Sequence, residues 1–326
     1  MFIAIQGAAL TAHTIPGNVL HGLVGRIGPP NYPAKDNRMR SLCRVTAGLF
    51  LSGFSSLSLG APLAQLTAYE APPAWLTPIA PLRISDNVWQ IGTASLTSLL
   101  VKTPDGLVLI DGGMPQQSTL TLDNIRRLGM NPSDVRYIFH SHAHIDHAGP
   151  LAAIREATGA TLVSNAESAT LLQRGGAGDL HFGDRMNYRP AYADRLVQDG
   201  ETIELGAMVF TVHFTPGHTP GSMSWTWSDT RDGKPLRMAY VDSLSAPGYK
   251  LAQNPRYPKL VEAFRSSFAR VRALPCDLLI TPHAEGSGWD YGNAAAPHPK
   301  PMSCADYADD AERKLEQNLA KQSATS

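Results

Sequence analysis

The sequence predicts an α/β protein with one domain over residues 65–326, an αββα four-layer sandwich in which two β-sheets pack face to face beneath outer helices. Apolar runs of strand length alternate with segments that repeat every 3.6 residues. The alternation occurs twice, over residues 87–172 and again over residues 202–319. In both halves, strand-like runs end in loops that carry histidine. Two such halves imply two sheets with helices outside them.

The composition is ordinary for a soluble globular protein, with 326 residues, 43% hydrophobic and 17% charged. The formal net charge is zero but unevenly spread, because residues 1–64 hold five of the 28 basic and one of the 28 acidic residues. The remainder is mildly acidic and has no basic cluster. This argues against nucleic acid as a partner and leaves a small molecule as the expected one. We expect a monomer.

The N-terminal segment has the pattern of a secretory signal rather than of a folded element. Basic residues precede an apolar run at 45–60, and Ala61-Pro62-Leu63-Ala64 offers small residues for cleavage. We therefore expect a signal peptide at 39–64 and a periplasmic mature protein. The run is short for a membrane span, although an uncleaved anchor is the alternative. Residues 1–38 are interpreted as an over-extended, unstructured N-terminus, with synthesis starting at Met39.

The cysteine count agrees with export. Cys43 lies inside the expected signal, which leaves Cys276 and Cys304 in the mature chain. In an oxidising compartment an even pair predicts one disulfide, Cys276–Cys304, that ties the last helix to the body. Two unpaired buried thiols are the alternative.

In the first half, turn residues delimit the expected elements. A Pro-rich arm at 70–82 has neither the helical nor the strand period. Strands are expected at 87–91, 98–103, 106–110, 135–139 and 161–164, and helices at 118–128, from 151 onward and at 166–172. Asp111-Gly112-Gly113 ends the third strand, and Gly129 ends the first helix.

A glycine-dense loop at 175–184 leads to the second half, and we expect it to be mobile. It lacks the Lys-Ser/Thr that follows a phosphate-binding loop. Strands are then expected at 202–205, 209–214, 222–227, 238–241 and 278–280, and helices at 260–274 and 305–319.

The most informative stretch is residues 139–150, a turn between an apolar strand and a helix. Here His142, His144, Asp146 and His147 crowd one small volume. Imidazole and carboxylate ligands at such a turn suit a borderline-soft divalent metal, above all zinc. A polar loop that happens to be rich in histidine is the alternative.

The pattern His142-x-His144-x-Asp146-His147 resembles the signature of the metallo-β-lactamase superfamily. Residues 215–221, 242–249 and 281–283 make the chain most similar to class B, subclass 3 enzymes. The resemblance runs from about Trp75 to the C-terminus. It implies the same αββα sandwich, with the metals in a cleft along one sheet edge.

The resemblance also implies a ligand set for two Zn²⁺ ions per chain. A three-His site comprises His142, His144 and His218, and a mixed site comprises Asp146, His147 and His283. Three protein ligands with an open position are typical of catalytic zinc, whose bound water titrates near neutral pH. For His283, a core histidine is the alternative. We expect His140 to pack behind the ligands and assign no role to His181, His213 or His298.

Ser243 stands where other subclasses place a zinc-binding cysteine, so the resemblance gives that ligand role to His147. Ser243 and Ser245 are then free to bind a substrate carboxylate, with turn formation as the alternative. Tyr249 is expected to donate to the oxyanion formed at the attacked carbonyl. It could instead be a packed rim aromatic.

Other residues have supporting roles in this interpretation. Asp146 also orients the metal-bound hydroxide and relays the proton. Trp75 and the loop at 175–184 line the cleft. Asp111 either orients a ligating histidine through its other ring nitrogen or is a simple turn residue.

The resemblance implies hydrolysis of the β-lactam ring of penicillins, cephalosporins and carbapenems, and hence antibiotic resistance. One alternative is a glyoxalase II-like thioesterase or a lactonase, in which an Asp bridges both metals. Asp242 lies one residue from the expected serine function, so a one-residue shift in register would give that reading. A periplasmic zinc-binding protein is the second alternative, although a zinc buffer would close its coordination.

Overall fold

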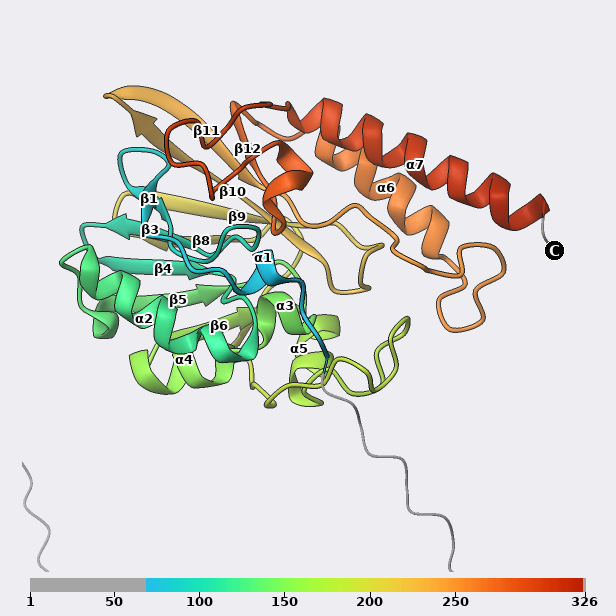
Figure 1. The fold of residues 1–326 in the computed structure, drawn as a ribbon, viewed down its shortest axis with the longest axis horizontal. Coiled ribbons are helices and arrows are strands. Elements are labelled where there is room, and N and C mark those ends of the chain that lie inside the picture. Colours follow the sequence, from blue (N-terminus) through green and yellow to red (C-terminus); the bar gives the residue numbers. More distant parts are fainter. Residues whose placement is uncertain (1–68, 325–326) are drawn as a thin grey trace, which may run out of the picture. The chain divides into compact units, whose positions relative to one another are not determined.

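The computed structural model describes residues 69–324, which belong to one compact unit (Figure 1). The segments expected as an over-extended N-terminus at 1–38 and a signal peptide at 39–64, with Cys43, lie outside the described residues. Within residues 69–324, no helix has both the length and the apolar character needed to cross a membrane.

The first sheet is mixed and takes its strands in sequence order. Its members are β1 (Leu82–Arg83), β2 (Val88–Gln90), β3 (Leu99–Thr103), β4 (Gly106–Ile110), β5 (Val135–Phe139), β6 (Thr161–Ser164) and β7 (Arg195–Leu196). The strands β1 to β4 pair antiparallel, and β4 to β7 pair parallel. Parallel neighbours need crossover connections. These contain α2 (Ser118–Arg127), α4 (Leu151–Thr158) and α5 (Ala166–Gln173).

The second sheet has the order β12-β11-β10-β9-β8. Its strands are β8 (Thr202–Leu205), β9 (Met208–Phe214), β10 (Met223–Arg231), β11 (Lys234–Tyr240) and β12 (Leu278–Ile280). Only the β11–β12 pair is parallel among them, and α6 (Leu260–Arg272) lies in the connection. The C-terminal α7 (Cys304–Ala324) lies beside α6 on the outside of this sheet (Figure 1).

The main core lies between the two sheets. Phe139 of β5 stacks on Trp225 of β10 with ring centroids 4.0 Å apart, and Phe210 of β9 meets Phe139 edge-on at 5.4 Å. A second cluster packs α2 and α4 against the first sheet, and a third packs α6 and α7 against the second. The expected αββα sandwich is therefore confirmed.

The expected elements are present, with differences at their ends and in short segments. The hairpin of β10 and β11 continues to the pair Arg231↔Lys234, beyond the expected strands, because Asp232 and Gly233 adopt positive φ and close a tight turn. The Pro-rich arm contains α1 (Pro73–Leu76), which starts with proline. The short helices η1 (Pro115–Gln117), η2 (Pro132–Asp134), α3 (Ile145–Ala148) and η3 (Ala284–Ser287) have no helical period long enough to read.

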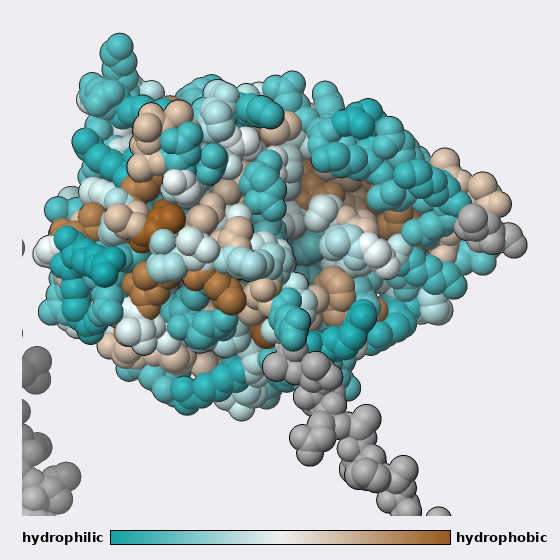
Figure 2. All heavy atoms as spheres, viewed as in Figure 1, coloured by the Kyte–Doolittle hydropathy of each residue, from teal (hydrophilic) through white to brown (hydrophobic). Residues whose placement is uncertain are grey.

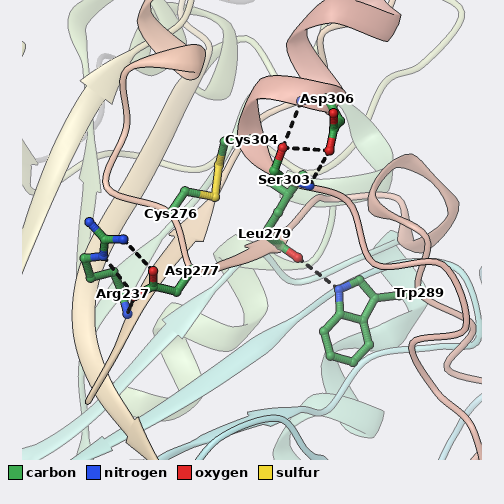
Figure 3. The surroundings of a disulfide bond; sticks show 8 residues. All are labelled: Arg237, Cys276, Asp277, Leu279, Trp289, Ser303, Cys304 and Asp306. Atoms are coloured by element: carbon green, nitrogen blue, oxygen red, sulfur yellow. Dashed lines mark hydrogen bonds and ion pairs between the residues drawn. A yellow bond between two sulfur atoms is a disulfide. The ribbon is translucent and has the colours of Figure 1, made fainter. Parts of the chain in front are cut away.

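The disulfide Cys276–Cys304 is present, with the two Cα atoms 6.2 Å apart (Figure 3). It joins the segment just before β12 to the first residue of α7. Ser303 caps this helix, because its Oγ accepts from the Asp306 N–H at 3.1 Å while the Asp306 carboxylate accepts from the Ser303 N–H at 3.3 Å. The start of α7 is thus fixed twice, covalently and by a capping box.

Candidate metal centre

A cleft of about 690 Å³ lies between α7 on one side and, on the other, the loops at the ends of strands in both sheets. Figure 2 shows it as a hollow beneath the hydrophilic edge of α7, with apolar residues inside. His144, Asp146, His218 and His283 lie in its wall. Four of the six expected metal ligands therefore face one cleft, and the other two lie behind them.

The three-His group forms where two loops meet. His142 and His144 come from the turn between β5 and α3, and His218 comes from the connection between β9 and β10. One nitrogen from each ring lies within 4.8 Å of the others, and all three side chains are buried. Their ring centroids are 4.6 to 4.9 Å apart.

The mixed group is tighter. Asp146 Oδ2 lies 3.1 Å from His147 Nε2 and 3.2 Å from His283 Nε2, and the two nitrogens are 3.2 Å from each other. Asp146 and His147 belong to α3, whereas His283 follows β12. His142 also lies close enough to join Asp146 and His147 in one group of donor atoms.

These donors fit a divalent metal. A tetrahedral zinc with ligands near 2.0–2.1 Å places its ligand atoms about 3.3 Å apart, close to the three spacings in the mixed group. His142 Nε2 is buried and has no hydrogen-bond partner among the described residues. Such an orphaned nitrogen is costly unless something binds its lone pair. The donor chemistry and the orphaned nitrogen both indicate a metal ion.

Each of four ligand histidines has an acceptor near the ring nitrogen that faces away from the cluster. We call these groups the outer acceptors. The pairs are His142 Nδ1 with Asp242 Oδ1 at 2.8 Å, His144 Nε2 with Asp179 Oδ2 at 3.2 Å, His218 Nδ1 with the Ser245 carbonyl at 2.8 Å, and His147 Nδ1 with Asp111 Oδ2 at 3.6 Å. An acceptor on one nitrogen holds the proton there and leaves the other nitrogen for the metal.

Asp111 illustrates how the fold supports this arrangement. Its φ of 60° is in the left-handed region, where an aspartate is tolerated. Its carboxylate accepts from the Ser141 N–H and Oγ at 2.7 Å each and from the Tyr240 hydroxyl at 2.6 Å. Asp111 therefore lies beside the ligand His147, but the 3.6 Å between Asp111 Oδ2 and His147 Nδ1 is longer than a hydrogen bond, so both sequence interpretations of Asp111 stay open.

The charges of the cluster favour cations at the mixed site. Burial opposes the charged form of His147, but the carboxylates of Asp146 and Asp111 hold its pKa at about 9. Burial lowers the pKa of His142 and of His218 well below the usual range, with the neighbouring histidines adding to the effect. His142 and His218 are thus held neutral, with a ring nitrogen free to bind a metal, whereas a metal at the mixed group displaces a proton from His147.

The expected cleft residues are brought together in part. Ser243 and Ser245 line the cleft, and Trp75 lies at its wall with its ring 5.0 Å from that of His283. Phe182 and Met186, in and just after the glycine-dense loop, line it as well. Their place at the cleft is as expected, and their roles in binding substrate stay predictions.

Tyr249 does not have the expected place. Its side chain is only 2% exposed, and its hydroxyl donates to the His218 carbonyl at 2.9 Å. Its ring stacks on His181 with centroids 3.4 Å apart. The hydroxyl proton is thus engaged by the His218 carbonyl, and Tyr249 is not among the residues that line the cleft, so its role as an oxyanion donor stays a prediction. In this structure Tyr249 supports His218.

The other histidines have packing roles. His140 Nε2 contacts Ser164 Oγ at 2.9 Å, His213 contacts Thr226, and His298 stacks on Trp289. Asp179 was not expected as a site residue, and Asp242 was expected only as a bridging ligand in the alternative interpretation. The sequence offered one indication of this role for Asp179, which is that an aspartate lies in the glycine-dense loop that follows the histidine motif.

Comparison with known proteins agrees with this geometry. Residues 92–232 match the model of the metallo-beta-lactamase superfamily. The chain is 36% identical to a Cronobacter sakazakii metallo-beta-lactamase described by a HARLDQ motif, over 77% of this chain and 98% of that one, with a TM-score of 0.72. The chain belongs to the metallo-beta-lactamase superfamily. It is a metal-dependent hydrolase by that membership, and it carries His-Ala-His-Ile-Asp-His at 142–147.

Other relatives differ in what they are named for. A subclass B3 metallo-beta-lactamase of Bradyrhizobium japonicum is 32% identical, over 77% of this chain and 98% of that one, with a TM-score of 0.71. A hydroxyacylglutathione hydrolase of Anaeromyxobacter dehalogenans is 31% identical over 55% of this chain and 58% of its own. An N-acyl homoserine lactonase of Agrobacterium fabrum is 32% identical over 32% and 40%. The chain thus spans about half the length of these two curated relatives.

Proposed function

We propose that this protein hydrolyses the β-lactam ring of β-lactam antibiotics with two Zn²⁺ ions in the cleft, and thereby confers resistance. One observation carries the choice among hydrolases of this superfamily. Ser243 faces the cleft, whereas Asp242 is fully buried on the outer nitrogen of His142. An aspartate that bridges two metals would have to lie on the inner side of the cluster. Asp242 does not, which favours the lactamase over the thioesterase and lactonase readings.

The metal ligands are the two groups of three already described. Bound zinc would supply Lewis acidity and a nucleophilic water at neutral pH. At His142, His144 and His218 the outer acceptor lies within hydrogen-bond distance and would hold the imidazole in the tautomer that leaves its inner nitrogen free. The carboxylate of Asp146 lines the cleft beside His283, where it would orient the attacking water and accept its proton.

The substrate would lie along the cleft wall. The hydroxyls of Ser243 and Ser245 would donate to the carboxylate that β-lactams carry next to the ring nitrogen. Trp75, Phe182 and Met186 would form the apolar part of the wall, against which ring substituents pack. The cleft thus combines an apolar wall with polar and charged groups that would orient the substrate.

We further propose that the protein is exported through the segment at 39–64 and acts in the periplasm as a monomer. The disulfide Cys276–Cys304 supports an oxidising compartment. Amino-terminal sequencing of protein recovered from a periplasmic extract would test both the cleavage site and the compartment. Recovery of uncleaved protein from the membrane fraction would favour the anchor instead.

The function is tested by turnover of four substrates with and without a chelator. These are a chromogenic cephalosporin, a carbapenem, an N-acyl homoserine lactone and a glutathione thioester. Chelator-sensitive hydrolysis of both β-lactams, at rates well above those for the lactone and thioester, is expected. Preference for the thioester or the lactone in zinc-loaded protein would overturn the proposal. Metal analysis of the same sample should give two zinc ions per chain.

A further inference from the structure

The glycine-dense loop at 175–184 reaches the metal centre through one carboxylate. Asp179 Oδ1 accepts from the backbone N–H groups of His181 and Phe182, both at 2.7 Å. Asp179 Oδ2 lies 3.2 Å from His144 Nε2. The side chain of Asp179 is buried, and its backbone pairs with Gly183 in both directions. One carboxylate therefore closes the loop and also contacts a metal ligand.

The position of this loop sets one wall of the cleft. The Phe182 ring meets His144 edge-on with centroids 5.2 Å apart, and Phe182 and Met186 line the cleft. At the end of the loop, the Tyr188 hydroxyl donates to the Ala143 carbonyl inside the ligand motif at 2.6 Å. The loop and the motif are thus joined by polar contacts at Asp179 and at Tyr188, and of these two the Asp179 contact involves a ligand ring.

The glycines of this loop are required by its closed conformation and do not only make it flexible. Gly175 and Gly176 have positive φ, and a Cβ there would lie 2.2 Å from the Tyr188 carbonyl and 2.6 Å from the Met186 carbonyl. Any other residue would push the two sides of the loop apart. The sequence therefore selects this closed arrangement and not only a flexible connection.

We propose that Asp179 is a positioning residue that couples metal binding at His144 to the closed position of the 175–188 segment. The inference rests on the proposed metal-dependent function. His144 can give Nδ1 to a metal only when its proton is on Nε2, and that proton then donates to Asp179. Metal binding strengthens the contact that holds the loop, and by linkage a held loop strengthens metal binding. Loss of the metal loosens the wall formed by Phe182 and Met186.

The Asp179→Asn variant separates the two duties of the carboxylate. The asparagine oxygen can still accept from His181 and Phe182, so the loop turn is retained. Its NH₂ group then faces His144 Nε2, where two donors oppose each other and favour the tautomer that cannot bind through Nδ1. The matched control is Asp184→Asn, because the exposed Asp184 accepts from Gly178 N–H at 2.8 Å in the same loop but contacts no ligand.

Two measurements on purified protein test the coupling without reference to turnover. Zinc affinity is measured by competition with a chromophoric chelator, and amide hydrogen exchange is followed in the peptide that contains His181 and Phe182. We expect zinc to slow exchange in the unaltered protein and in Asp184→Asn. In Asp179→Asn we expect zinc affinity to fall about 10- to 100-fold and the effect of zinc on exchange to be lost.

Several results would overturn the coupling. One is exchange in the unaltered protein that zinc does not change, a test that needs no variant to fold. Another is an Asp179→Asn variant with unchanged zinc affinity or with full zinc protection of the loop. A coupling that is present in a protein without β-lactam turnover would sink only the proposed substrate. An unaltered protein that binds no zinc would overturn both.

Discussion

The disulfide Cys276–Cys304 is the covalent link whose contribution to stability can be worked from the structure. It closes a loop with a sequence separation of 28, which includes β12 and η3. In the chain-entropy model, removing a cross-link of this length lowers the free energy of unfolding by about 3.6 kcal/mol. For a domain of this size that corresponds to a fall in Tm of about 7 to 14 °C. We expect this loss in the double variant Cys276→Ser/Cys304→Ser.

The same variant should keep its turnover once zinc is bound. Ala308, Ala311 and Leu315 remain buried against the body, so α7 stays docked without the covalent link. Its Tyr307 hydroxyl contacts the Leu244 N–H at 3.1 Å and the Asp242 carbonyl at 3.4 Å, which brackets Ser243. Docking of α7 therefore holds the segment that we expect to bind substrate.

The assay is urea denaturation of metal-free protein, since bound metal adds its own binding free energy to the apparent stability. Ser303→Ala is the matched control, because it removes the cap of α7 and leaves the disulfide, at a cost of about 1 kcal/mol. A double variant that loses no more than this control would refute the loop-closure reasoning. Loss of turnover in a folded, zinc-loaded double variant would show that the covalent link, and not packing, holds the Ser243 segment.

Three further predictions concern the metal centre, Tyr249 and an ion pair on the surface. Removing metal with a chelator should abolish hydrolysis and lower Tm, and added zinc should restore both; activity that survives complete metal removal would contradict the assignment. Tyr249→Phe should keep turnover within about tenfold, because the hydroxyl serves the His218 carbonyl; a loss of about 10²- to 10³-fold would support the oxyanion role. Hydrogen bonds from the Arg237 side chain and N–H lower the pKa of Asp277 from 3.8 to about 2. This folded value lies below the unfolded one, so the stabilisation is present above about pH 4 and is lost as the pH falls toward 2. Asp277→Asn should therefore flatten the acid slope of stability in that window, and an unchanged slope would exclude the pair as its cause.

Local chemistry made much of the fold predictable. The limits of β4 and β5 coincide with apolar runs that Asp111-Gly112 and the histidine motif terminate. The expected metal ligands His142, His144, Asp146 and His147 lie in one short segment between a strand and a helix. Their spacing therefore already predicts that their side chains converge. The hairpin of β10 and β11 was underestimated because its outer residues are polar and lie at the edge of the core, where composition does not report pairing.

Among the outer acceptors, Asp111 was anticipated because it ends a strand beside the histidine motif, but Asp179 and Asp242 could not be predicted in this way. Asp242 is 100 residues from His142, and Asp179 is 35 residues from His144. No spacing rule relates such pairs, because the fold and not the local backbone brings them together. The orientation of Tyr249 could not be predicted for the same reason, since its hydroxyl donates to a carbonyl 31 residues away.

Whether Asp242 or Ser243 faces the cleft depends on tertiary contacts that the sequence motif does not contain. Adjacent residues in extended chain point to opposite sides, so a shift of one residue would turn the carboxylate toward the cleft and the serine away from it. Three contacts fix the register beyond β11: Val241 N–H to the Ile280 carbonyl at 2.9 Å, Asp242 N–H to Ser224 Oγ at 3.0 Å and Leu244 N–H to the Tyr307 hydroxyl at 3.1 Å. They come from β12, β10 and α7, which are far apart in sequence. The packing of three elements on this segment therefore decides that Ser243, and not Asp242, faces the cleft.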